Sequence, residues 1–188
     1  MRDKVGENVS LRRSVDRAGM GTLLALSVAS ARPAAAQVTF GSPADPPNIA
    51  LGAGAFDFLP NSKKKFSQTS AQLQGEYRFG DVLWIVAPFV GLMGTSAGAF
   101  YGYAGFGFDV NFGPHWVVTP TFAGGYFYRG EGTNLGSWWE FRSGAEFDYR
   151  FENRSRLGIA FYHMSNAGLT KTNTGEEALL LVYSVPLR

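Results

Sequence analysis

Three residue types that cooperate in ester hydrolysis lie close together near the end of the chain. The segment FYHMSNAGLTKTNTGEEALLL, residues 161–181, contains His163, Ser165 and Glu177. A serine hydroxyl becomes a nucleophile when an imidazole accepts its proton, and a carboxylate can hold that imidazole in the productive orientation. The same residues could instead mark where apolar strands meet water. The secondary-structure elements that carry them distinguish these two interpretations.

The composition limits the chemistry that is available. The 188 residues include no cysteine and only two histidines, His115 and His163, so we expect neither a metal site nor a disulfide. Nothing in the sequence indicates a cofactor. Aromatic residues make up 15% of the chain, charged residues 17%, and there are 24 glycines. This composition favours closely packed strands over helices.

The N-terminal segment has the layout of a secretory signal. Basic residues that include Arg12 and Arg13 precede the apolar run MGTLLALSVASA, and the small residues of RPAAAQ follow it. The run is too short to cross a bilayer as a helix. We expect residues 1–36 to be a cleaved signal peptide and residues 37–188 to be the mature domain.

The net charge of the expected mature domain is close to zero. Residues 1–36 contain six of the 17 basic and three of the 15 acidic residues, so 11 basic and 12 acidic residues remain, a net charge of −1. A protein that binds nucleic acid usually carries a basic patch on the domain that does so. We therefore do not expect nucleic acid as a partner.

From residue 48 onward, apolar and polar side chains alternate in segments that turn residues separate. The pattern predicts eight strands, at residues 48–59, 69–79, 82–94, 99–111, 115–128, 136–151, 155–165 and 177–187. In WEFRSGAEFDYRF, residues 139–151, apolar residues alternate with charged ones over a length that exceeds the usual strand of a soluble protein.

A transmembrane barrel explains these strands better than a soluble sandwich, whose strands are shorter. Outer-membrane barrels also have short turns at one end and longer loops at the other. The connections alternate in this way: tight at 79–81, 112–115 and 152–155, longer at 60–68, 130–136 and 166–176, with 94–98 as a short exception. We predict an all-β, eight-stranded antiparallel transmembrane β-barrel, a multi-pass protein of the outer membrane of a Gram-negative bacterium.

The strand at residues 155–165 carries His163 and Ser165 on the same face as its larger apolar residues. That face contains Leu157, Ile159, Phe161, His163 and Ser165. Because the larger apolar set must face lipid, both polar residues are expected on the outer wall. Residues two positions apart on one face are separated by about 6.6 Å, which leaves room for an imidazole to approach a serine hydroxyl.

The next strand supplies the carboxylate. Glu177 shares its face with Leu179, Leu181 and Tyr183, and antiparallel pairing through the loop 166–176 can place it beside His163. Glu176 lies on the opposite face and is the weaker candidate.

The run FYHMSNAGL, followed by NTGEE and a strand that ends in YSVPLR, resembles the C-terminal signature of the PagL family of lipid A 3-O-deacylases. The close match covers residues 161–186, and the rest agrees only in architecture, length and export signal. The resemblance implies an eight-stranded outer-membrane barrel that hydrolyses the ester-linked acyl chain at position 3 of lipid A.

The resemblance also implies the role of individual residues. These are Ser165 as nucleophile, His163 as general base, Glu177 as orienting carboxylate, the Gly168 N–H and the Asn173 side chain as oxyanion hole, and Asn166 as a residue that shapes the turn. Met164 stands where the family usually has an aromatic residue. Since Met164 points inward by parity, we expect altered packing and intact chemistry.

The implied partners are the outer membrane and lipid A of lipopolysaccharide, with the active site facing the outer leaflet. Lys63–Lys65 would be close to lipid A phosphates, or would simply be a solvated loop. Lipid-facing aromatic residues are compatible with a homodimer. Two alternatives stay open: a non-enzymatic structural or adhesion barrel, and a phospholipase-type acyl hydrolase with the same triad.

Overall fold

The computed structural model of the chain describes residues 37–59 and 69–187. The predicted signal segment 1–36 and the basic run Lys63–Lys65 lie outside these described residues. No helix within the described ranges is long and apolar enough to cross a membrane.

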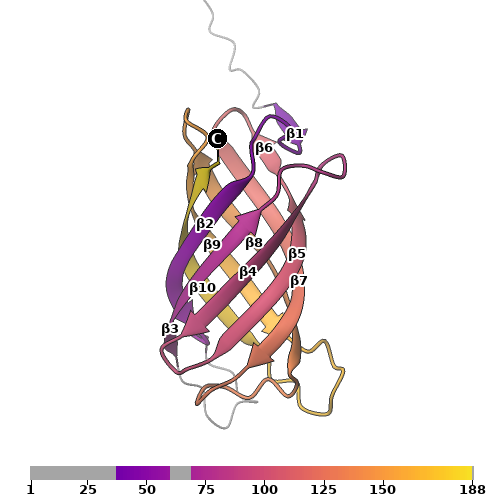
Figure 1. Ribbon diagram of the computed structural model, residues 1–188, viewed down its shortest axis with the longest axis vertical. Coiled ribbons are helices and arrows are strands. Elements are labelled where there is room, and N and C mark those ends of the chain that lie inside the picture. Colours follow the sequence, from indigo (N-terminus) through magenta and orange to yellow (C-terminus); the bar gives the residue numbers. More distant parts are fainter. Residues whose placement is uncertain (1–36, 60–68, 188) are drawn as a thin grey trace, which may run out of the picture. The chain divides into compact units, whose positions relative to one another are not determined.

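Eight long antiparallel strands of the described chain close into a barrel, and two strands of three residues lie at one end (Figure 1). The strands are β1 (Val38–Phe40), β2 (Asn48–Phe56), β3 (Ser70–Arg78), β4 (Val86–Thr95), β5 (Phe100–Phe108), β6 (Val110–Phe112), β7 (Trp116–Tyr128), β8 (Trp139–Arg150), β9 (Arg156–Ser165) and β10 (Glu176–Pro186). The sheet order is β1-β6-β7-β5-β4-β3-β2-β10-β9-β8, and pairing of β7 with β8 closes the barrel. The predicted eight-stranded antiparallel barrel is confirmed.

The two ends of the barrel differ in their connections. One end, here called the long-loop end, carries the end of β2, the start of β3 and the connections 96–99, 129–138 and 166–175. The other, the short-turn end, carries 79–85, 113–115 and 151–155 together with β1 and β6. The long-loop end is at the bottom of Figure 1, and the C-terminus lies at the top.

Two strand predictions need correction at the short-turn end. The strand predicted at 99–111 is interrupted at Asp109, whose carboxylate lies inside the barrel 2.6 Å from Arg156 Nη2. The strand predicted from residue 82 begins only at Val86. A tight bridge between Leu83 and Val86 turns the chain there, and Trp84 adopts a positive φ of 63°.

The strand alternation separates an apolar exterior from a mostly polar interior. On β9, Leu157, Ile159 and Phe161 are exposed, whereas Tyr162 and Met164 are buried in the lumen. The inward position predicted for Met164 is confirmed. A closed barrel with an apolar outer wall leaves no unpaired strand edge for lipid to cover.

Ion pairs and aromatic rings fill the lumen. Arg78 Nη2 lies 2.6 Å from Glu76 Oε2 and 2.5 Å from Glu146 Oε1. Arg142 Nη2 lies 2.8 Å from Glu76 Oε1, and its guanidinium carbon is 4.1 Å from the ring centroid of Tyr162. Because these side chains are packed against one another, the interior is a core and not a channel.

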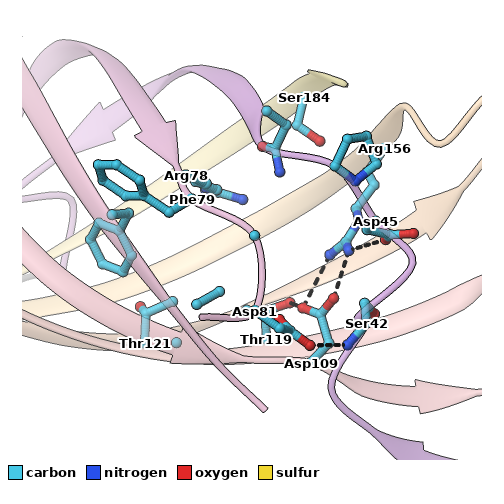
Figure 2. A pocket seen from close by; sticks show the side chains of 16 residues that line it. Ser42, Asp45, Arg78, Phe79, Asp81, Asp109, Thr119, Thr121, Arg156 and Ser184 are labelled. Carbon is cyan, nitrogen blue, oxygen red and sulfur yellow. Dashed lines mark hydrogen bonds and ion pairs between the residues drawn. The ribbon is translucent and has the colours of Figure 1, made fainter. Parts of the chain in front are cut away.

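Further ion pairs and hydrogen bonds connect the segment before β2, which contains Ser42 and Asp45, to the short-turn end of the barrel. Figure 2 shows Arg156 directed between Asp45 and Asp109, and its Nη2 lies 2.6 Å from a carboxylate oxygen of each. The Ser42 N–H donates to Asp81 Oδ2 at 2.5 Å. These residues line a cavity of about 50 Å³, which is large enough for a few water molecules.

Candidate active site

The register between β9 and its two neighbours places three polar side chains at one level of the outer wall. His163 on β9 is opposite Glu177 on β10 and opposite Ser143 on β8. Side chains that are directly opposite in antiparallel strands have Cβ atoms about 4.5–5.5 Å apart. The predicted pairing of His163 with Glu177 is confirmed. Ser143 is a neighbour that the sequence analysis does not identify.

The imidazole and the carboxylate of this pair are in contact. His163 Nδ1 lies 3.2 Å from Glu177 Oε1, and the two side chains are 45% and 20% exposed. The adjacent Glu176 is buried in the lumen, where its Oε2 accepts a hydrogen bond from the Asp57 N–H. If Nδ1 donates its hydrogen to the carboxylate, Nε2 keeps its lone pair and can accept a proton.

Ser165 ends β9 on the same face as His163, opposite Phe141 of β8. Its side chain is half-buried. Among the hydrogen bonds of the described residues, none joins the Ser165 hydroxyl to the His163 ring. Catalytic hydrogen bonds often form only when substrate is bound, so the lack of this bond does not argue against proton transfer in a substrate complex.

A tight turn follows the serine. The Leu169 N–H donates to the Asn166 carbonyl at 3.0 Å, and the two residues between them, Ala167 and Gly168, have φ values of 53° and 80°. Two consecutive positive φ angles are the signature of a type I′ turn. Gly168 adopts this conformation without strain, whereas Ala167 is strained by its Cβ atom.

Asn166 holds the turn together from inside the loop. Its side chain is buried, and its Oδ1 accepts the Gly168 N–H at 2.9 Å. Its Nδ2 lies within hydrogen-bonding distance of Leu135 O, Thr170 Oγ1 and Thr172 O. The Gly168 N–H is therefore engaged with a side chain of its own turn. Asn173 lies further along the same loop and is exposed.

Gly175 is a contact residue that sequence reasoning missed. A Cβ atom added to Gly175 would lie 2.9 Å from His163 Cε1 and 3.5 Å from Nε2, and its φ is +63°. The absence of a side chain therefore makes room for the imidazole at this position. The glycine in the run NTGEE is the only sequence signal of this close contact, and it does not indicate which side chain approaches.

The wall around the polar group is aromatic. The Phe161 ring lies 6.3 Å from that of Phe58, in an edge-on arrangement, and the Phe141 ring is stacked 5.8 Å from that of Phe122. Exposed apolar side chains next to a polar group are suited to a substrate with a hydrocarbon chain.

Other residues that could carry chemistry lie elsewhere or do not cluster. His115 is at the short-turn end, where its Nδ1 lies 3.0 Å from the Arg150 carbonyl and its ring stacks on Tyr149. Among residues 37–59 and 69–187, no three His, Cys, Asp or Glu side chains are grouped so that they could hold a metal ion.

The closed strand order, the apolar wall and the packed polar lumen define a transmembrane β-barrel of the outer-membrane type. The sequence identifies the family more specifically than the fold does. Residues 60–186 match the sequence model of the family described as lipid A 3-O-deacylase (PagL), and the chain belongs to this family.

Comparison with one solved structure supports the barrel fold. The crystal structure of the outer membrane enzyme PagL superposes with a TM-score of 0.60 at 21% sequence identity, covering 74% of this chain and 99% of that one. A structure from the de novo design of transmembrane β-barrels has a TM-score of 0.44 at 16% sequence identity, covering 74% of this chain and 97% of that one. The Yersinia pestis outer membrane protein Ail also has a TM-score of 0.44, at 11% identity, covering 74% of this chain and 99% of that one. Comparison with curated protein sequences gives no match.

Proposed function

We propose that the protein is an outer-membrane esterase that removes the 3-hydroxyacyl chain from position 3 of lipid A, with Ser165 as nucleophile. The observation that supports this most directly is the contact between His163 Nδ1 and Glu177 Oε1 on the outer wall, with Ser165 two residues along the same face. Family membership supplies the substrate, since the family is described as lipid A 3-O-deacylase.

In the first half of the reaction, Ser165 Oγ attacks the carbonyl carbon of the ester while His163 Nε2 takes the hydroxyl proton. Glu177 stabilises the resulting imidazolium. The tetrahedral intermediate then breaks the bond between the carbonyl carbon and the sugar oxygen, and His163 returns the proton to that oxygen. The products are an acyl-serine and a free hydroxyl at position 3.

In the second half, a water molecule attacks the acyl-serine and gives its proton to His163. The second intermediate breaks the bond between the carbonyl carbon and Ser165 Oγ, which recovers the proton. The 3-hydroxy fatty acid leaves and the enzyme returns to its starting state.

The negative charge on each intermediate requires hydrogen-bond donors, and we assign this role to the Gly168 N–H and the Asn173 side-chain amide. The Gly168 N–H donates to Asn166 Oδ1 before substrate binds. In the transition state this hydrogen must be shared with the substrate oxygen or transferred to it, so Asn166 both shapes the turn and holds the donor in place.

The location of the substrate follows from the orientation of the barrel in the membrane. Outer-membrane barrels carry their longer loops on the cell exterior. In this orientation Ser165 lies at the height of the outer leaflet, where lipid A is found, and the aromatic wall contacts its acyl chains.

The test uses purified, refolded protein with lipid A and with phospholipid in the same detergent, and measures the released fatty acid by mass spectrometry. We expect loss of the position 3 chain from lipid A, and at least about a thousandfold slower release by Ser165→Ala or His163→Ala. Ser143→Ala is the matched control, because Ser143 is also next to His163 and exposed.

Each alternative predicts a different result. Release of fatty acid from phospholipid alone would make the protein a phospholipase-type hydrolase. Equal activity of Ser165→Ala and the parent would support a non-enzymatic barrel with contaminating activity. Loss of activity in Ser143→Ala together with full activity in Ser165→Ala would move the nucleophile to β8.

A further inference from the structure

We propose that the loop between β7 and β8 is a template that positions the active-site loop, residues 166–175. The part that does so is Asn134–Leu135–Gly136, here called the template segment. This inference rests on the proposed function, because it assigns the template segment to the placement of the oxyanion donors of that reaction.

Three consecutive carbonyl groups of the template segment lie within hydrogen-bonding distance of side chains of the active-site loop, although the Thr170 hydroxyl shares its hydrogen with the Thr172 carbonyl at 2.8 Å. Thr174 Oγ1 donates to the Asn134 carbonyl at 2.8 Å, Asn166 Nδ2 to the Leu135 carbonyl at 2.9 Å, and Thr170 Oγ1 lies 3.1 Å from the Gly136 carbonyl. These contacts are spread from one end of the active-site loop to the other. The loop is therefore fixed along its length and not only where it joins β9 and β10.

The template segment is itself anchored to the barrel. Leu135 is buried in the apolar cluster of the barrel interior, and the hydroxyl of the preceding Thr133 donates to the Asp57 carboxylate at the end of β2. The Asn134 side chain accepts the Gly136 N–H at 3.0 Å, which fixes the local conformation. A loop held by packing and by its own hydrogen bonds is rigid enough to position its neighbour.

Gly136 makes the close approach of the two loops possible. Its φ is +99°, and an added Cβ atom would lie 1.9 Å from the Thr172 carbonyl oxygen and 3.0 Å from Asn166 Nδ2. The first clash is with backbone, so a side chain at this position must push the active-site loop away. The added Cβ atom would also crowd Asn166 Nδ2, and Asn166 is the residue whose Oδ1 accepts the Gly168 N–H.

The template segment is therefore a positioning element, which acts on the reaction through Asn166. Displacing it should leave the wall that contacts the acyl chain unchanged, and should misplace the donors that stabilise the intermediates. Small misplacements of groups that act in the transition state lower kcat more than they weaken substrate binding.

The test compares Gly136→Ala with Gly98→Ala. Gly98 also lies at the long-loop end and has a φ of +75°, but an added Cβ atom there meets nothing within 4 Å. Both variants therefore place an alanine at a positive φ, and only Gly136→Ala also introduces a clash with the active-site loop. For Gly136→Ala we expect kcat on lipid A to fall about 10- to 100-fold with KM changed by less than about twofold. For Gly98→Ala both constants should stay within about twofold.

A gentler pair of variants covers the case in which Gly136→Ala does not fold. Thr174→Val removes the hydroxyl that donates to Asn134, and we expect kcat to fall about 2- to 10-fold. Thr172→Val is the control, because no hydrogen bond of the Thr172 hydroxyl is found among the described residues. Folding is checked by the shift in electrophoretic migration on heating, and active enzyme is counted by titration with a fluorophosphonate.

A third comparison separates positioning from general destabilisation. If the template segment acts through the oxyanion donors, Gly136→Ala should lower kcat less in an Asn173→Ala background than in the parent, because both changes damage one unit. Equal factors in the two backgrounds, or unchanged kcat in well-folded Gly136→Ala and Thr174→Val, would overturn the inference. Activity that survives Ser165→Ala would instead overturn the proposed function.

Discussion

At the scale of single residues, the position of the His163 ring is fixed from two sides. Glu177 contacts Nδ1, while Gly175 leaves space for the edge that carries Cε1 and Nε2. A catalytic base must have both the right nitrogen free and the right direction of approach. The contact with Glu177 leaves Nε2 free, and the space at Gly175 allows the ring to take its orientation.

The first prediction concerns Gly175. Gly175→Ala places a methyl group 2.9 Å from His163 Cε1, so the ring must rotate or shift from its present position. We expect kcat/KM on lipid A to fall about 10- to 100-fold, measured as fatty acid release per titrated active site. Gly113→Ala is the control, since Gly113 has a φ of +72° and an added Cβ atom there meets nothing within 4 Å. Equal effects of the two substitutions would mean that backbone strain, not contact with the ring, is responsible.

Part of the candidate site could be predicted from residue types and parity. The pairing of His163 with Glu177, and the lower rank of Glu176 as a candidate, follow from the period of two in a strand. The contact from Gly175 and the neighbour Ser143 could not be predicted, because they depend on ring orientation and on the register of β8. The engagement of the Gly168 N–H with Asn166 depends on a turn geometry that the sequence only permits.

At the scale of elements, β9 has two different surfaces. Its outward side chains contact lipid and include the catalytic candidates, whereas its inward side chains pack in the lumen. The depth of an outward position in the membrane therefore determines which substitutions it tolerates.

The second prediction compares two apolar residues that are similarly exposed. Ile159 on the wall of β9 is 55% exposed, and Leu169 in the active-site loop is 65% exposed. Ile159→Lys should lower the free energy of unfolding by about 2–4 kcal/mol in phospholipid vesicles, because it places a charge in the hydrocarbon region. Leu169→Lys should change it by about 0.5 kcal/mol or less, because a loop side chain remains in water. Denaturant titration followed by tryptophan fluorescence measures both, and similar values would argue against a lipid-facing wall on β9.

The strands were predictable where alternation was uninterrupted. The predicted limits extend too far at both ends of the barrel. At the long-loop end, the strand predicted at 48–59 ends at Phe56 and the one predicted at 136–151 begins at Trp139. At the short-turn end, a strand is interrupted at Asp109, and the apolar run 82–85 forms a turn although its composition is typical of a strand. The short strand β1 lies before a segment with three prolines and pairs with β6.

At the scale of the whole molecule, buried charges hold the barrel together across its lumen. Arg142 is paired with Glu76 on a strand that is distant in the sheet order, so the ion pair crosses the interior instead of following the wall. No pattern in the sequence identifies such cross-lumen partners, since parity says only that both residues point inward.

The third prediction contrasts a buried with an exposed arginine. The Arg142 side chain is 3% exposed, whereas that of Arg154, which pairs with Asp45, is 46% exposed. Arg142→Ala should lower the free energy of unfolding by about 3–5 kcal/mol, because it leaves the buried Glu76 carboxylate with less compensation and removes packing from the three aromatic rings that its guanidinium contacts. Arg154→Ala should change it by at most about 1 kcal/mol. Equilibrium denaturation in one detergent compares them, and a small loss for Arg142→Ala would mean that water or Arg78 compensates for the missing charge.

The outward position of the His163–Glu177 pair has a consequence for how turnover must be measured. An enzyme whose reactive groups open sideways into an amphiphile layer encounters its substrate by lateral diffusion within that layer. The relevant concentration is then the mole fraction of substrate among all amphiphiles and not its molarity in the tube. Adding inert detergent at constant protein and lipid A should therefore slow the reaction, and rates from different micelle compositions become comparable only after correction for this surface dilution.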